Sequence, residues 1–179
     1  MRTTEEMLAD LKVWVEHETP THDPVRVSAL AHHIDGRFQA LGAATRRIEG
    51  CRGHGDHLLA ESRWGGGRAP VLILCHIDTV HPVGTLADNP FRVEGDKAFG
   101  PGIYDMKGGA YLAYRAFADI AAGDTAGLRP LQVLYTADEE VGSPTSRELI
   151  TELGRAAHAV LVVEPAREGG KIVTSRRGV

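Results

Sequence analysis

Three short, largely apolar runs limit the folds open to this chain more than any other feature of its sequence. They span residues 71–76, 131–136 and 159–163. Runs of this kind are typical of parallel strands that are buried on both faces of a sheet. The sequence therefore predicts a sheet built around three buried strands.

The segments between these runs carry the signals of helices. Thr3 and Glu6 have the spacing of a capping box, and Asp23-Pro24 has the pattern of an N-cap and first turn, with Gly42 placed to end the second helix. Ser143-Pro144 indicates another helix start. The other expected elements are strands near 44–48 and 57–62, a hairpin of residues 91–93 and 97–99, and a helix from about 106 to 122. Because strands alternate with helices, we predict an α/β fold with a doubly wound, mostly parallel sheet flanked by helices.

Composition excludes several classes of partner. The 179 residues suit one domain, and a net charge of −4 with 25% charged residues gives no basic surface for nucleic acid. No apolar run approaches the roughly 20 residues that a membrane span needs, and the N-terminus lacks the pattern of a secretion signal. Two cysteines, Cys51 and Cys75, are too few for a disulfide scaffold. We therefore expect a cytoplasmic protein with reduced thiols and with no nucleic-acid or membrane partner.

Each predicted buried strand is followed by residues that bind metals or transfer protons. His76 and Asp78 follow the first run, Asp138-Glu139-Glu140 the second, and Glu164-Pro165 the third. Asp105 lies in a fourth cluster, the glycine-rich segment 100–109, at the start of a predicted helix. Open α/β sheets place their sites at the carboxyl ends of the strands. We expect these side chains to meet on one rim.

Each of these residues has an ordinary structural explanation when it is taken alone. A histidine at a strand end is most often a hydrogen-bonded core residue, Asp105 suits a helix cap, Glu139-Glu140 suits a solvated acidic loop, and Glu164-Pro165 a turn. Together, however, several carboxylates on one rim repel one another unless a cation neutralises them. Imidazole and carboxylate ligands without thiolate favour Zn²⁺, with Mn²⁺ or Co²⁺ as alternatives.

Four motifs in this order resemble the M20 family of metallopeptidases. They are His76-Ile77-Asp78-Thr79-Val80, the segment 100–109, Asp138-Glu139-Glu140-Val141-Gly142-Ser143 and Glu164-Pro165. The family includes glutamate carboxypeptidase, acetylornithine deacetylase and succinyl-diaminopimelate desuccinylase, and the resemblance covers nearly the whole chain.

The resemblance implies a role for each motif residue. Asp105 is expected to bridge two zinc ions, His76 and Glu164 to complete one metal site, and Glu140 to bind the other metal. Asp78 is expected to orient the imidazole of His76, and Glu139 to act as general base on the attacking water. The implied activity is hydrolysis of an amide bond in a small peptide or N-acyl amino acid, of the carboxypeptidase or deacylase type, which Glu164 in place of an aspartate favours.

The chain also departs from the family pattern. Family members continue through a lid and dimerisation domain, which makes them typically homodimers, and return to the catalytic domain with a further metal-binding histidine. Residues 1–179 therefore match the N-terminal portion of a catalytic domain, truncated at its C-terminus, with Ser175–Val179 as a strand that leads toward the lid. Two hypotheses follow: part of an active two-zinc hydrolase, or a truncated, catalytically inactive fragment that binds metal.

Overall fold

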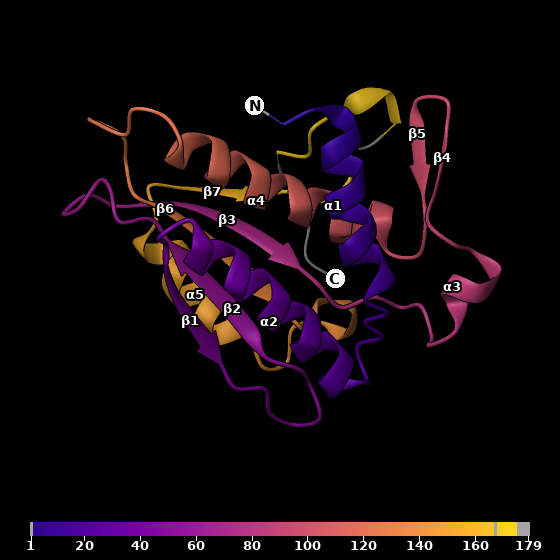
Figure 1. The fold of residues 1–179 in the computed structure, drawn as a ribbon. Helices are drawn as coiled ribbons and strands as arrows, with labels where there is room; N and C mark the ends of the chain where they lie inside the picture. Colours follow the sequence, from indigo (N-terminus) through magenta and orange to yellow (C-terminus); the bar gives the residue numbers. More distant parts are fainter. Residues whose placement is uncertain (1, 167, 175–179) are drawn as a thin grey trace.

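The chain folds into a five-stranded sheet with helices on both faces (Figure 1). The computed structural model describes residues 2–166 and 168–174, so the predicted strand at Ser175–Val179 lies outside the described residues. The strand order is β1-β2-β6-β3-β7. The strands are β1 (Ala44–Ile48), β2 (His57–Glu61), β3 (Val71–His76), β6 (Leu131–Thr136) and β7 (Ala159–Val162).

The sheet is mixed, with its parallel part at the strands that carry the strongest apolar runs. β3 pairs in parallel with β6 on one side and with β7 on the other. β2 pairs antiparallel with both β1 and β6. The predicted α/β fold with flanking helices is confirmed, and the two early strands extend the parallel sheet as an antiparallel ribbon.

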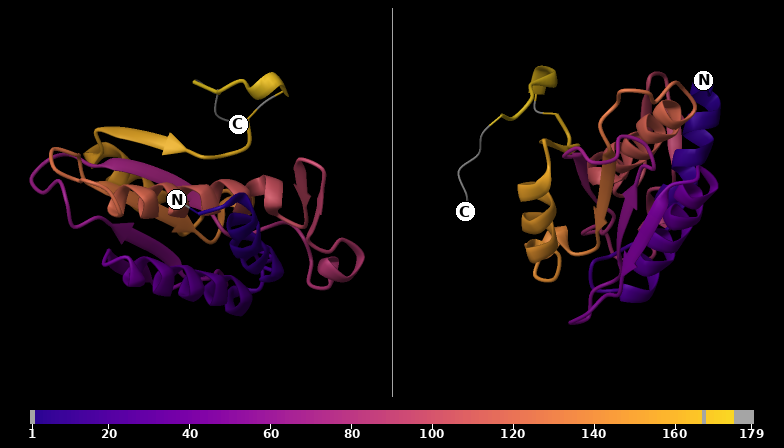
Figure 2. Two further views of the ribbon diagram at one scale, coloured as in Figure 1. Left: turned by 45° about the horizontal axis from the view of Figure 1, so that its top comes forward. Right: turned by 90° about the vertical axis from the view of Figure 1, so that its left-hand side faces the viewer.

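Helices α1 (Thr4–Glu16), α2 (Pro24–Ala40) and α4 (Gly108–Ala121) cover one face, and α5 (Arg147–Ala156) covers the other (Figure 2). Alternating side chains of β3 serve the two layers: Ile73 and Cys75 join the larger core cluster, whereas Leu72 joins the cluster under α5. The predicted capping box at Thr3 and the Asp23 cap are both present. The first two helices therefore begin where the sequence places them.

The connections that follow β3 and β6 lie on opposite faces of the sheet. The connection from β3 to β6 runs through α4 on one face, whereas the connection from β6 to β7 runs through α5 on the other face (Figure 2). Adjacent strands whose connections diverge in this way open a crevice at their carboxyl ends. The polar residues that follow β3 and β6 lie at this end of the sheet.

Two predicted helices begin at other residues in the structure. The helix expected at Ser143-Pro144 begins only at Arg147, because Thr145 and Ser146 bind the buried carboxylate of Asp138 in a turn before the helix. The helix expected from Met106 begins at Gly108, after a turn of residues Ile103–Lys107 in which the backbone of Asp105 and Met106 is not helical.

The third predicted buried strand is in fact an exposed edge. Val160, Leu161 and Val162 of β7 are 43%, 51% and 55% exposed, although β3 beside it is largely buried. The prediction of burial is wrong for this strand because β7 pairs with β3 on one side only, and the described residues place no cover over its two faces. Its apolar side chains therefore form an apolar edge of the sheet.

A two-stranded hairpin projects beside the sheet (Figure 1). It consists of β4 (Arg92–Glu94) and β5 (Lys97–Phe99), follows the short helix α3 (Thr85–Asp88), and confirms the predicted hairpin. Among the described residues, no helix combines the length and the apolar character that crossing a membrane requires.

Candidate metal centre

His76 is the last residue of β3, and its imidazole ring is almost fully buried. Its side chain is 1% exposed. The Nδ1 atom lies 3.0 Å from the backbone carbonyl oxygen of Asp78 and 3.4 Å from a carboxylate oxygen of the same residue. An N–H at Nδ1 that donates to Asp78 leaves Nε2 directed toward the rim. The ring is thus oriented as a metal-binding histidine requires.

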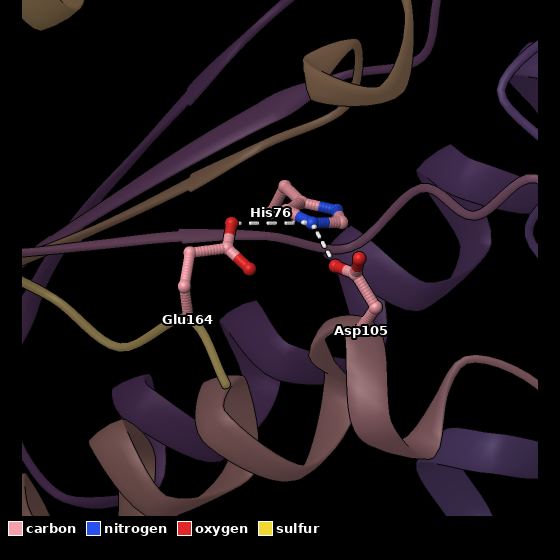
Figure 3. A group of neighbouring side chains, drawn as sticks. All are labelled: His76, Asp105 and Glu164. Atoms are coloured by element: carbon pink, nitrogen blue, oxygen red, sulfur yellow. Dashed lines mark hydrogen bonds and ion pairs between the residues drawn. The ribbon is translucent and has the colours of Figure 1, made fainter. Parts of the chain in front are cut away.

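Asp105 reaches Nε2 of His76 from the turn before α4. One of its carboxylate oxygens lies 3.0 Å from Nε2, and its side chain is 56% exposed (Figure 3). Its backbone is not helical, with φ −123° and ψ 103°, and the first residues of α4 have no side-chain cap. The alternative that Asp105 is an ordinary helix cap is therefore wrong, because its carboxylate turns toward the imidazole.

Glu164 approaches the same nitrogen from the segment that follows β7. Its carboxylate lies 3.5 Å from Nε2 of His76 (Figure 3). This approach depends on Gly109 in the first turn of α4, because a Cβ atom at that position would lie 2.1 Å from the carbonyl oxygen of Val163. A glycine there lets the chain after β7 pass directly over the start of α4, and so brings Glu164 opposite Asp105.

The three side chains fit a divalent cation. Within the described residues, His76, Asp105 and Glu164 form a group whose candidate ligand atoms all lie within 4.8 Å of one another. Two ligand atoms bound to zinc at about 2.0–2.2 Å in a tetrahedron are roughly 3.3–3.6 Å apart. The distance of 3.5 Å from Nε2 to Glu164 lies within that range, and the distance of 3.0 Å to Asp105 lies slightly below it. Three protein ligands with one open position are also the usual set of a catalytic zinc.

Glu139 and Glu140 lie at the rim in a 3₁₀ turn after β6, formed by Glu139–Val141. A carboxylate oxygen of Glu139 lies 3.8 Å from Nε2 of His76, and this side chain is 50% exposed. Glu140 is not among the three residues that form the close group. The structure therefore brings the carboxylates of Asp105, Glu139 and Glu164 around the imidazole of His76, with Glu140 outside this group.

Asp78 connects His76 with the turn that carries Glu139 and Glu140. It is fully buried, and its carboxylate accepts hydrogen bonds from the backbone N–H groups of Glu139 and Glu140 at 3.2 and 3.3 Å. It also accepts one from the hydroxyl of Thr21 at 2.8 Å. Asp78 therefore holds the turn of the two glutamates as well as facing His76. Only its role beside His76 is predicted from the sequence.

The electrostatics of the site favour positive charge. Burial alone lowers the pKa of His76, but the hydrogen bond and charge of Asp78, with the charges of Glu164 and Glu139, raise it to about 9. Burial, together with neighbouring carboxylates, raises the pKa of Glu140 and of Glu164. These shifts have the signs expected where several carboxylates surround one cationic group, and a bound divalent cation would relieve the same repulsion.

Two buried polar residues near the site, Lys107 and His57, were not predicted to have a role there. Lys107 is 1% exposed, donates a hydrogen bond from Nζ to the carbonyl oxygen of His17 at the end of α1, and has its pKa lowered to about 7 by burial. His57 of β2 contacts the loop after β6. Lys107 lies in a recognisable motif, but no local signal points to His57, because its contacts are 80 and 88 residues away in the chain.

Comparisons with known proteins agree with this geometry. The model of a family described as "Peptidase family M20/M25/M40" matches residues 72–175. Carboxypeptidase G2 of Pseudomonas sp. (strain RS-16) is 35% identical over 164 residues, which cover 91% of this chain and 39% of that protein. A succinyl-diaminopimelate desuccinylase of Xanthomonas oryzae is 32% identical over 157 residues, covering 81% of this chain and 40% of that protein.

Solved structures agree on the fold. Human carnosine dipeptidase 1 superposes with a TM-score of 0.77 at 20% identity, over 91% of this chain and 39% of that structure. At this identity the likeness concerns the fold alone. The chain thus spans about two fifths of the length of the relatives that it matches.

Proposed function

This chain belongs to the peptidase family M20/M25/M40, and on that premise we propose that it carries most of the active site of a two-zinc hydrolase that cleaves an amide bond of a small peptide or N-acyl amino acid. The observation that carries the proposal is the convergence of Asp105 and Glu164 on the buried Nε2 of His76, at 3.0 and 3.5 Å. A solvated acidic surface cluster would not be expected to enclose a buried imidazole whose other ring nitrogen is held by the backbone carbonyl of Asp78.

In this proposal His76, Asp105 and Glu164 hold the first cation, and Asp105 with Glu140 contributes to the second. Divalent cations bound there would polarise the carbonyl of the substrate and lower the pKa of an attacking water. The first set is complete for a three-ligand site with an open position. The second set, Asp105 and Glu140, is short of a ligand among the described residues, of which only the first set forms a close group of three.

The position of Glu139 supports the proposal that it is the general base. Its side chain is half exposed and therefore accessible to water and substrate, while its backbone N–H is fixed by the buried Asp78. Its carboxylate is 3.8 Å from Nε2 of His76, next to the proposed metal position without belonging to the close group. We assign to Glu139 the acceptance of the water's proton and its transfer to the leaving amine.

The names of the relatives guide the substrate class. A carboxypeptidase and a desuccinylase both act on amides of amino acids, and both are more than 30% identical to this chain. We therefore propose a substrate whose amine product is an amino acid with a free carboxylate. Zinc is our assignment for the metal, because the ligands are nitrogen and oxygen atoms without thiolate.

The exposed edge strand supports a further part of the proposal, that residues 1–179 are the N-terminal portion of a larger catalytic domain. Exposed apolar edge strands invite pairing with additional strands, and β7 exposes Val160, Leu161 and Val162 next to the site. The lid and dimerisation domain, and a further histidine for the second metal, then lie outside this portion.

A second candidate is that the chain as given binds one cation and hydrolyses nothing. The observation that favours it is that the described residues hold one close group of three candidate ligands and no second group of this size.

Zinc titration followed by an assay of amide hydrolysis separates the two candidates. We expect at least one equivalent of Zn²⁺ to bind, and hydrolysis of N-acetyl-glutamate or of a glutamate-terminated dipeptide to be abolished by a chelator and restored by zinc. Glu139→Gln should keep the metal but lower kcat by about 100- to 10,000-fold, whereas Glu152→Gln on the exposed side of α5 should change neither. Metal binding without turnover supports the second candidate, and the absence of metal binding refutes both.

A further inference from the structure

His57 extends the sheet ladder beyond the end of β6 with its side chain. The last backbone pair between β2 and β6 at this end joins Leu58 and Tyr135. One residue beyond β6, the backbone N–H of Ala137 donates to Nδ1 of His57 at 3.1 Å. The imidazole therefore accepts a hydrogen bond at the point where the pairing of the two strands has stopped.

The second ring nitrogen binds the same loop further along the chain. Nε2 of His57 lies 3.0 Å from the hydroxyl oxygen of Thr145. That hydroxyl has one hydrogen, which it donates to the carboxylate of Asp138 at 2.7 Å. Nε2 must therefore be the donor and Nδ1 the acceptor, so that His57 is the neutral tautomer with its proton on Nε2. The ring is 2% exposed, and burial lowers its pKa, which agrees with a neutral imidazole.

Asp138 closes the loop from inside. Its buried carboxylate accepts hydrogen bonds from the N–H of Thr145 at 2.6 Å, and from the N–H and hydroxyl of Ser146 at 3.1 and 2.6 Å. Its carbonyl oxygen accepts the N–H of Ser143 at 2.9 Å. His57 thus links this closed loop to β2, since it contacts both Ala137 at the start of the loop and Thr145.

Glu139 and Glu140 lie in the chain between Ala137 and Thr145, the two residues that His57 contacts. Asp78 holds their backbone N–H groups from the side of β3. His57 holds the loop from the side of β2, on the opposite edge of β6. A loop held at one edge of β6 only could rotate about that attachment. The carboxylates of Glu139 and Glu140 would then change direction.

We propose that His57 is a positioning residue: through Ala137 and Thr145 it fixes the loop that carries Glu139 and Glu140 in its orientation toward His76. The importance of that orientation for catalysis rests on the proposed function, whereas the attachment itself does not. His57 touches neither the reacting atoms nor the three residues of the close metal group, and acts only through the loop.

The test measures hydrogen exchange of the backbone amides of residues 137–146 in the full chain without metal. His57→Leu removes both side-chain bonds, and we expect these amides to exchange about 10- to 100-fold faster, as the loss of two buried hydrogen bonds implies. Leu59→Ala, two residues along β2 and facing α5, is the matched control that lowers global stability without touching the loop. Loop exchange no faster in His57→Leu than in Leu59→Ala at equal global stability overturns the proposal.

A double-mutant cycle and a rescue variant identify the mechanism. Thr145→Val removes the acceptor of Nε2, so its effect and that of His57→Leu should be less than additive in the double variant, because both remove the bond between these two residues. His57→Gln retains an amide that can reach Thr145, and we expect intermediate exchange. Additive effects, or a glutamine variant no better than leucine, contradict a joint hold by the two ring nitrogens.

Two further measurements separate positioning from general folding and from the proposed function. The ¹⁵N shifts of the His57 ring should report the tautomer protonated at Nε2, and the opposite tautomer refutes the assignment. The affinity for the first zinc ion in His57→Leu should stay within about threefold of wild type, because none of the three close metal residues lies on the loop. A fall in zinc affinity parallel to the rise in exchange would overturn a role confined to the loop. Failure of the wild-type chain to bind zinc would instead refute the proposed function and leave the exchange results to decide the role of His57.

Discussion

Zinc should displace a proton from His76, and the size of the effect can be worked out from the structure. Burial lowers the pKa of this imidazole, but Asp78, Glu164 and Glu139 together raise it to about 9. At pH 7 the metal-free ring is therefore protonated on both nitrogens. Since Nδ1 keeps its hydrogen bond to Asp78, the proton that leaves when the metal binds is the one on Nε2.

The competition weakens zinc binding by a predictable amount. A pKa of about 9 lies two units above pH 7, which corresponds to a roughly 100-fold loss of affinity, or about 3 kcal/mol at 1.36 kcal/mol per unit. The apparent affinity should therefore rise about tenfold per pH unit between pH 6 and 8, and level off near pH 9. Close to one proton should be released per zinc bound at pH 7.

Calorimetric titration in two buffers with different ionisation enthalpies measures the released protons directly. Asp78→Asn is the informative variant, because it removes the main group that raises the pKa of His76 and leaves burial, which lowers it. Proton release at pH 7 should then fall well below one. A zinc affinity that is independent of pH between 6 and 8, or no proton release in the wild-type chain, would refute the reasoning.

Three further predictions concern the supports of the site and the stability of the fold. Gly109→Ala should weaken zinc binding at least tenfold, because its Cβ would lie 2.1 Å from the carbonyl oxygen of Val163. The control is Gly154→Ala in α5, where a Cβ meets open space. This control should leave zinc binding unchanged and stabilise the chain by about 0.5–1 kcal/mol in urea unfolding. In the metal-free chain, the raised pKa of His76 contributes stability that is fully present below the unfolded pKa near 6.5 and is lost as the pH rises toward 9. The urea midpoint should therefore fall between these two pH values. A midpoint that rises instead would contradict the expected direction of the pH dependence. Leu161→Lys on the exposed edge should reduce self-association in sedimentation experiments, with a change in unfolding free energy below about 0.5 kcal/mol.

Local signals determined most of the elements. The Thr3 cap and the Asp23-Pro24 start are made within four residues of chain, so their helices begin as predicted. The apolar runs identify β3 and β6 because a strand between two layers must be apolar on both faces. The polar residues after these strands could be assembled into a candidate site before the structure, because carboxyl ends of parallel strands share one edge of a sheet.

Local signals failed where the outcome depends on what lies beside a segment in space. The run 159–163 has the composition of a buried strand, yet β7 is an exposed edge, since burial depends on neighbours on both sides. Ser143-Pro144 has the pattern of a helix start, but the hydrogen bonds offered by Asp138 keep residues 143–146 in a turn.

The sequence by itself determined which residues can bind a metal and which strand ends carry them. Only the tertiary structure decided how they meet: that Asp105 faces His76 and does not cap a helix, that Glu140 lies outside the close group, and that His57 reaches Thr145 across 88 residues of chain. The physical reason is that a residue type fixes the chemistry a side chain offers, whereas its partner is fixed by strand order and by the packing of distant segments.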